Sequence, residues 1–483
     1  MMVLGSGKWF TRVFLAVAAL HKLTGIFSPL VFRAMSLVGP AAFVPRRLKL
    51  LALLGQRGSG ATLQAAADQG RHVDLGGRVW VLERPLTVKD KHLTLSNGVL
   101  FAPTVPRKDG QKRFKFGILV AVGGSEGRLT LNNCHLVNVG VVALKAHATI
   151  RGGSISRVAT GSAVDVAGGG RLLAQDVDIR RCQFGIVAAG TGSLVDISRC
   201  RITDSGVNGV EVGKGACGIL EKTLVQKSAS VGVLATGRKA DGPSKVTVVD
   251  CRIDSTERGS GVLVRKGAQL ELGQTTITNT HDSSVMVVGP RSLATAKGGL
   301  LHGSLFGHCV SVEGGGAAEL TKVRLERPNT CGVQVQDEGS YALVKDCTIH
   351  EALESHAVTV VGGAKLVLDS CDCRRAAASG VYACDQGSIV SIMGCTIGDL
   401  PEGNGVQALD GALVEVMNTK IERVQRAGVF ADGKETVVNV GFAQLVDCAE
   451  GKEVSANGGV VKHSKADRGT ACKAGAGGAA FEY

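Results

Sequence analysis

The segment Leu129-Thr-Leu131-Asn-Asn-Cys134-His-Leu136 contains the pattern that decides the fold of this chain. Leu129 and Leu131 alternate with polar residues, which is typical of a β-strand with one buried face. After a two-residue polar break comes a small residue, Cys134, and two positions later the aliphatic Leu136 ends the unit. The same unit returns along most of the chain, so we interpret the chain as an array of repeats.

The last aliphatic residue of the unit recurs at a nearly constant spacing. The steps are 19, 24, 23, 23 and 28 residues, followed by eight steps of 24. The recurring positions are Leu136, Ile155, Ile179, Ile202, Val225, Ile253, Ile277, Leu301, Leu325, Ile349, Cys373, Ile397, Ile421 and Leu445. Most repeats then add a second motif, as in Gly332-Val-Gln-Val335 and Gly380-Val-Tyr-Ala383, and a glycine-rich turn. Each repeat therefore predicts three short strands separated by turns.

Two solenoid families have repeats of this length. A leucine-rich repeat needs another Leu three positions before the unit, where this chain has Glu126, Gly192 and Pro243, and its second half is helical. The Gly-Val-x-Val motif and the glycine-rich turns disfavour a helix. A parallel β-helix, in which each rung buries its apolar side against its neighbours, fits all three strands.

The chain resembles the right-handed parallel β-helix proteins of the pectate-lyase-like superfamily over roughly residues 61–460. Residues 61–68 resemble the capping helix of that superfamily, and His72-Val-Asp-Leu75 and Val79-Trp-Val-Leu82 resemble its first strands. The resemblance implies an all-β, right-handed parallel β-helix solenoid of about 14–16 rungs, with a 24-residue period and an N-terminal capping helix.

The two ends of the chain differ from the repeats in composition. We expect residues 1–60 to form a basic, acid-free leader, residues 61–464 the β-helix, and residues 465–483 a disordered Gly/Ala-rich tail. The apolar runs of the leader are too short for a transmembrane helix. Its composition favours a transit peptide for a plastid or mitochondrion, with a secretory signal or an extension that contacts a membrane surface as alternatives.

The net charge of +13 belongs mainly to the leader. Eight Lys and Arg residues precede the first acid, Asp68, so the remaining chain holds 55 − 8 = 47 basic residues against 42 acids. This balance gives no strong nucleic-acid signal. No phosphate loop or zinc motif is present, so we expect no cofactor.

The 14 cysteines follow the expected core. Six of them occupy the small position of the repeat: Cys134, Cys200, Cys251, Cys347, Cys371 and Cys395. We interpret them as reduced core thiols because their Cβ vectors are expected to be parallel, a poor geometry for disulfides. Reduced thiols favour an intracellular reducing compartment, with a secreted protein as the alternative to an organelle or the cytoplasm.

The enzymes of the superfamily, as the resemblance implies, use carboxylates, Arg or His to act on acidic polysaccharides, and their local motifs are missing here. The outward positions instead alternate in charge, as in Arg324 with Glu326, Asp372 with Arg374, and Lys420 with Glu422, which predicts a solvated ion-pair face. We therefore expect a non-catalytic scaffold that binds a protein or polysaccharide partner on its outer sheets and loops. A polysaccharide lyase, hydrolase or epimerase is the alternative.

Two sets of residues are candidate sites. The insertion 104–115 breaks the period and is basic and aromatic, so it is a candidate contact for an anionic partner through Arg107, Lys108, Lys112, Arg113, Phe114 and Lys115. In one outward column, successive rungs place His302, Glu326 and His350, which could bind a divalent metal or share a proton. The alternative for this column is a structural charge ladder.

Overall fold

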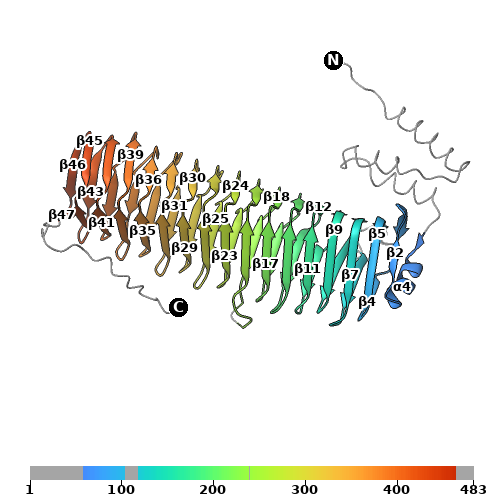
Figure 1. Ribbon diagram of the computed structural model, residues 1–483. Helices are drawn as coiled ribbons and strands as arrows, with labels where there is room; N and C mark the ends of the chain where they lie inside the picture. The colour runs from blue at the N-terminus through green and yellow to red at the C-terminus, as the bar shows by residue number, and fades with distance from the viewer. Residues whose placement is uncertain (1–57, 104–117, 239, 464–483) are drawn as a thin grey trace, which may run out of the picture.

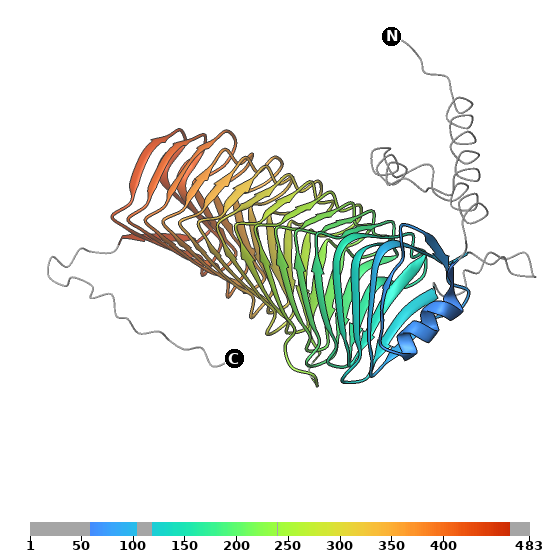
Figure 2. The same ribbon diagram turned by 45° about the vertical axis from the view of Figure 1, so that its right-hand side comes forward.

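The protein is a straight rod of stacked β-strands (Figures 1 and 2). The computed structural model describes residues 58–103, 118–238 and 240–463. They form an all-β, right-handed parallel solenoid of about 16 rungs with about 24 residues in each. The predicted fold class, repeat length and number of rungs are confirmed. The predicted leader and tail fall almost wholly outside the described residues.

Most rungs contribute one strand to each of three faces, whereas β5 (His92–Phe101), β7 (Arg128–Val137) and β9 (His147–Ser156) each run through faces 1 and 2. In one representative rung, β35 (Lys365–Asp369) belongs to face 1, β36 (Asp372–Arg374) to face 2 and β37 (Val381–Ala383) to face 3. The strands of faces 1 and 2 form one sheet of 31 strands, and those of face 3 a second sheet of 16, β4-β6-β8-β10-β13-β16-β19-β22-β25-β28-β31-β34-β37-β40-β43-β46. All the strand pairings within these sheets are parallel, so residues one rung apart stand side by side in columns about 4.8 Å apart.

A single residue in the left-handed region turns the chain from face 1 to face 2. Ser370, with φ of 56°, is this residue in the rung of β35 and β36, and Asp346 and Asn418 occupy the same place in other rungs. Short polar residues tolerate this conformation better than most. The turn brings the small residue of the repeat directly beneath the corner.

The small residue also supplies a hydrogen-bond donor, a role that its size alone did not reveal. In nine rungs its thiol or hydroxyl donates to the carbonyl oxygen two residues earlier, at 2.9–3.5 Å. The donors are Cys134, Cys200, Thr223, Cys251, Thr275, Cys347, Cys371, Cys395 and Thr419. The cysteines of the described residues are free thiols, and burial raises the pKa of Cys200 and Cys251 to about 11, which keeps the protons that these bonds need.

A short helix covers the N-terminal end of the rod, as predicted (Figure 1). Helix α4 (Gly60–Asp68) begins after Ser59, whose hydroxyl accepts from the backbone N–H of Thr62, and it buries Leu63. Gln64 exchanges two hydrogen bonds of 2.9 Å with the backbone of Thr87 in β4 (Leu86–Lys89), the first strand of face 3. The helix therefore satisfies the open sheet edge as well as covering the core. Within the described part of the chain, no helix is long and apolar enough to cross a membrane.

Candidate functional site

The predicted basic site falls in a segment that the structure does not describe. Arg107, Lys108, Lys112, Arg113, Phe114 and Lys115 all lie within residues 104–117. The binding role of this insertion therefore stays a prediction.

The predicted column of His302, Glu326 and His350 is assembled in register on face 2. β27 (Leu300–His302), β30 (Arg324–Glu326) and β33 (Thr348–His350) are consecutive strands, and the three side chains belong to directly paired residues. Among the residues that the structure describes, no group of three or more His, Cys, Asp or Glu could hold a metal ion. Glu326 lies 3.9 Å from the guanidinium of Arg324, and His350 contacts Asp372. Metal binding or proton sharing by this column stays a prediction.

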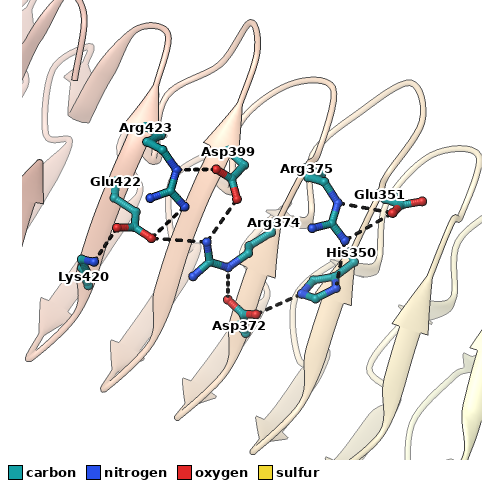
Figure 3. Close-up of polar contacts among 9 residues, drawn as sticks. All are labelled: His350, Glu351, Asp372, Arg374, Arg375, Asp399, Lys420, Glu422 and Arg423. Carbon is teal, nitrogen blue, oxygen red and sulfur yellow. Dashed lines mark hydrogen bonds and ion pairs between the residues drawn. The ribbon is translucent and has the colours of Figure 1, made fainter. Parts of the chain in front are cut away.

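Polar contacts on face 2 converge on Arg374, near the C-terminal end of the rod (Figure 3). Its Nε donates to Asp372 at 2.7 Å. One of its terminal nitrogens lies 3.1 Å from Asp399 in β39 (Thr396–Leu400) and 3.3 Å from Glu422 in β42 (Lys420–Val424). Arg374 thus joins three carboxylates from three rungs.

A glycine makes the longest of these contacts achievable. Arg374, Gly398 and Glu422 are register partners in successive strands, so the contact between Arg374 and Glu422 spans two rungs. A Cβ on residue 398 would lie 2.3 Å from the carbonyl oxygen of Glu422 and 3.1 Å from its Cγ. The missing side chain leaves the space in which the two charged groups meet.

Each carboxylate of this network forms an ion pair with at least one cation. Glu422 pairs with Lys420, with Arg423 at 2.9 Å and with Arg374, and its bonds to Lys420 and Arg423 lower its pKa to about 2. The hydrogen bond from Arg423, at 2.6 Å, is the largest cause that lowers the pKa of Asp399. Such groups stay ionised near neutral pH and cannot donate a proton.

His350 extends the network to the neighbouring rung. A guanidinium nitrogen of Arg375 lies 3.4 Å from its Nδ1, and Asp372 lies 3.1 Å from its Nε2. Because a guanidinium can only donate, Nδ1 accepts and Nε2 carries the proton that Asp372 accepts. With Glu351, which pairs with Arg375 at 3.2 Å, the nine residues of Figure 3 contain four cations and four anions, 4 − 4 = 0.

The predicted ion pairs of the outward columns are confirmed, but the face is less solvated than expected. Arg324 with Glu326, Asp372 with Arg374, and Lys420 with Glu422 all form ion pairs. Glu422 nevertheless exposes only 6% of its surface. Two shallow grooves of about 600 and 340 Å³ border the network, and Asp399 and Pro401 line both. Asp399, which lines both grooves, is already paired with Arg374 and Arg423.

Face 3 differs from face 2 in the same rungs, because its central outward column is uncharged. The strands are β28 (Val310–Glu313), β31 (Val333–Gln336), β34 (Val358–Val361), β37, β40 (Val406–Leu409) and β43 (Ala427–Asp432). Their register aligns Ser311, Gln334, Thr359, Tyr382, Gln407 and Phe430. Ser311 and Thr359 are buried, so the partly exposed members of the column are two amides and two aromatic rings, Gln334, Tyr382, Gln407 and Phe430.

A second polar column runs beside it and holds the rungs together. The side chains of His308, His356 and Asn404 each accept a hydrogen bond from a backbone N–H of the next rung, at 3.3, 3.0 and 3.0 Å. The imidazole Nδ1 atoms are the acceptors, so both histidines are neutral with the proton on Nε2. Burial lowers the pKa of His308 and of His356 to about 4.

The two columns meet in an aromatic contact. The rings of His356 and Tyr382 stack with their centres 4.5 Å apart and 16° between their planes. Ser379, between them in sequence, donates to Gln407 at 2.8 Å, so Gln407 is held in place. The resulting surface is preorganised and neutral.

Toward the N-terminus, the same outward column of face 3 carries acids. Asp165 in β10 (Ser162–Ala167), Val187 in β13 (Phe184–Ala189) and Glu211 in β16 (Val210–Gly213) are register partners. Burial, followed by repulsion from Glu211, raises the pKa of Asp165. Neither carboxylate forms an ion pair with another described residue, so this pair differs from the closed network of face 2.

None of the face 3 residues was proposed as a site from the sequence. Neighbours in this column are separated by 22–29 residues, so no local motif contains two of them. The signal that could have found them was the residue between the valines of Gly-Val-x-Val, read down the repeats instead of along them.

Comparisons with known proteins agree with this architecture. The family model described as "Right handed beta helix region" matches residues 117–298 and 306–473. No match was found among curated proteins. Among solved structures, the catalytic domain of a GH87 α-1,3-glucanase matches with a TM-score of 0.39 and 10% identity. The match covers 68% of this chain and 64% of the glucanase chain. A mutant of the periplasmic alginate epimerase AlgG matches at 0.37 and 9%, covering 81% and 84%.

A third similar structure is tailspike protein 3 of bacteriophage CBA120, at a TM-score of 0.32 and 12% identity, covering 85% of this chain and 57% of that one. The chain thus spans less than two thirds of the glucanase domain and of the tailspike protein. At these identities the likeness is one of fold alone.

Proposed function

We propose that this chain, which belongs to the family of right-handed β-helix regions, is a non-catalytic scaffold that binds an uncharged glycan chain lengthwise on face 3. The observation that carries the proposal is the neutral column of face 3, in which Gln334, Tyr382, Gln407 and Phe430 reach the surface.

The chemistry of this column suits a ligand that is rich in hydroxyl groups. The amide oxygen of Gln407 already accepts from Ser379 and Asn404, which leaves its NH2 group to donate to a sugar hydroxyl. The NH2 group of Gln334 donates one hydrogen to Gln336 and keeps the second for a ligand. Tyr382 and Phe430 add apolar surface against which a ring can pack. A polyanion would meet no cation in these rungs of the column, which argues for an uncharged polymer.

The repeat itself favours an elongated ligand. Equivalent groups follow one another about every 4.8 Å along a straight face, so a polymer can bind several rungs at once. Preorganisation by the rung-to-rung bonds of His356, Ser379 and Asn404 lowers the entropic cost of binding.

The test is calorimetric titration of the full chain with neutral oligosaccharides (β-glucan, α-glucan, xylan and mannan fragments) and with alginate and polygalacturonate fragments. We expect at least one neutral series to bind more tightly with increasing length. Tyr382→Ala should weaken binding about 30-fold, corresponding to about 2 kcal/mol at a central contact. Thr295→Ala on face 1 is the matched control. Tight binding of the acidic fragments alone, or binding that Tyr382→Ala leaves unchanged, would overturn the proposal.

A second candidate function is a carbohydrate-active enzyme that uses the acids of the same face. Two carboxylates in one column, Asp165 and Glu211, favour this function, because neither forms an ion pair with another described residue. The pKa of Asp165 is also raised. A raised pKa is what a general acid requires. Reducing-end and unsaturated-uronate assays on the same panel test it: Asp165→Asn and Glu211→Gln should each abolish turnover, and Asp372→Asn on face 2 should not.

A further inference from the structure

The turns that lead from face 3 back to face 1 form a continuous ridge along one edge of the rod. We call this edge the turn ridge. It can be followed along the lower edge in Figure 1, where the loop between β19 (Val233–Thr236) and β20 (Lys245–Val249) projects. This loop lies in the repeat whose step is 28 residues instead of 24.

The first half of the turn ridge is basic. Seven exposed cations lie in or beside its turns: Lys145, Arg171, Lys214, Lys245, Arg265, Lys266 and Arg291. None of them forms an ion pair with a carboxylate of the described residues. The acid Asp241 in this stretch already faces Arg238 at 3.8 Å. The positive charge of this half is therefore not neutralised within the described part of one molecule.

The second half of the same ridge is acidic. Its turns carry Glu313, Asp337, Glu338, Asp385, Asp410, Asp432 and Glu435, interrupted by Lys365 and Lys434. Two of these carboxylates hold the turns, because Asp337 accepts from the backbone N–H of Gly314 at 3.0 Å and Asp385 from that of Gly362 at 2.9 Å. None of the seven acids forms an ion pair with another described residue, so this half keeps its negative charge.

The two halves match in length and meet between the turns of Arg291 and Glu313. Six steps of about 4.8 Å separate the turn of Lys145 from that of Arg291, and five separate the turn of Glu313 from that of Glu435, so each half is roughly 25–30 Å long. The turn of Glu313 continues as Gly314-Gly-Gly316, which has no side chains, so little bulk surrounds this carboxylate.

We propose that the turn ridge is a self-association surface on which two copies of this chain pair antiparallel. A two-fold axis between the turns of Arg291 and Glu313 lays the basic half of each copy on the acidic half of the other. In this register Arg291 faces Glu313 of the other copy, Lys266 faces Glu338, and Arg171 faces Glu435. Each pair occurs twice by symmetry.

Alternative partners fit less of the surface. An anionic polymer would use the basic half and be repelled by the acidic half, whereas a second copy uses both. One step is mismatched, because the turn of Lys245 meets Lys365. The contact is a narrow charged strip, so we expect an association that depends on ionic strength more than on apolar burial.

Sedimentation velocity of the full chain at low salt and at about 0.5 M NaCl tests the proposal. We expect a dimer at low salt and at least a tenfold rise in the dissociation constant at high salt, because a Debye length of about 4–5 Å screens such pairs. A monomer at low salt, or a dimer that ignores salt, would overturn it.

Charge reversal gives the sharper test. The basic variant is Arg171→Glu, Lys266→Glu and Arg291→Glu; the acidic variant is Glu313→Lys, Glu338→Lys and Glu435→Lys, which spares the carboxylates that hold the turns. Each variant alone should be monomeric, and an equimolar mixture should restore a 1:1 complex. A matched control, Arg201→Glu, Lys227→Glu and Lys322→Glu, changes exposed cations away from the ridge and should dimerise as the wild type does.

Two results contradict the proposal. One is a mixture that stays monomeric although both variants keep the wild-type melting temperature. The other is an acidic variant that still dimerises while the basic variant alone loses binding to heparin, which would assign the basic half to a polyanion.

Discussion

Faces 2 and 3 belong to the same rungs and share one core, yet their outer surfaces carry different chemistry. Around residues 350–430, face 2 holds a closed set of four cations and four anions joined by Arg374, whereas face 3 presents amide and aromatic groups. On face 2 the side chains satisfy one another. On face 3 one column binds the next rung, and the column beside it is uncharged.

This difference indicates what each face can do. Charges that are already paired offer a ligand little, because binding must first break a contact. Neutral groups that are fixed by neighbouring rungs can exchange water for a hydroxyl-rich ligand at lower cost. The comparison predicts that disturbing face 2 changes stability, and that disturbing the outward column of face 3 changes binding.

The largest expected effect comes from the residue that joins the two faces inside the core. Gly380 precedes β37 of face 3, and a Cβ there would lie 2.2 Å from Cγ2 of Ile397, the inward residue of β39 on face 2. Gly380→Val should destabilise the rod by about 3 kcal/mol, since overpacking a filled core forces the backbone to shift. Urea unfolding measures the loss.

The control for Gly380→Val is Gly206→Ala, where every neighbour lies 3.5 Å or more from the added Cβ, and the expected change is within about 0.5 kcal/mol. Amide exchange should then quicken on both faces of the Gly380→Val rung. Faster exchange on face 3 alone would contradict a shared core.

The next effect separates the faces by pH. The pKa of His308 and His356 is about 4 in the folded protein, below the ordinary 6.5, so the unfolded chain binds more protons between these values. Their contribution to the free energy of unfolding is fully present above pH 6.5 and is lost as pH falls toward 4. At pH 5 the loss is about 2 kcal/mol for each histidine. For Glu422 the folded pKa of about 2 lies below the ordinary 4.5, so its contribution is present above pH 4.5 and is lost as pH falls through 2.

Melting temperatures measured from pH 7.5 to 2 check these two windows. His308→Asn with His356→Asn should flatten the decline between pH 6.5 and 4, because Asn404 already accepts a backbone N–H from the same column. Glu422→Gln should leave that decline intact. If the decline in melting temperature between pH 6.5 and 4 persists in the double variant, groups other than these two histidines cause it.

The repeat could be predicted from the sequence because burial acts on every rung alike. Leu136, Ile253 and Ile397 obey one rule, that an inward residue must be apolar, so the period and the three strands were visible in the sequence. The opposite charges two residues apart were also local, and they do form ion pairs. The capping helix was visible for the same reason.

The candidate site was not visible because its residues obey no shared rule. Thr359, Tyr382 and Gln407 are adjacent in space only through the stacking of rungs, and each replaces the others in the column without changing the core. The contact between Arg374 and Glu422 spans two rungs and needs the space that Gly398 leaves. Comparing neighbouring residues in pairs could not reveal this contact.

A smaller effect tests whether face 2 acts as one network. Arg374 exposes 22% of its side chain and contacts three carboxylates, so Arg374→Met should cost about 1–2 kcal/mol by leaving them clustered without their shared cation. Arg324→Met is the control, because Arg324 is 60% exposed and 3.9 Å from Glu326, and its loss should cost less than about 0.5 kcal/mol.

Arg374→Lys should fail to restore stability, since one ammonium cannot reach the three carboxylates that the planar guanidinium joins. Equal stability of Arg374→Lys and the wild type would reduce the network to an ordinary surface ion pair. Glycan binding should be unchanged in all three variants if the faces act independently.

The smallest effect concerns the core that both faces share. The Cys371 thiol donates to the carbonyl of Asp369 at 3.4 Å, and the Cys371 N–H donates to the sulfur of Cys395. Thr419 makes the equivalent donor bond in its own rung, because its hydroxyl donates to the carbonyl of Met417 at 2.9 Å. Cys371→Thr should therefore change the free energy of unfolding by less than about 0.5 kcal/mol, whereas Cys371→Ala loses the donor and should cost about 1 kcal/mol. Urea unfolding of the two variants measures the difference. If Ala were tolerated better than Thr, the position would select for size alone, and the corner beneath face 2 would not need its hydrogen bond.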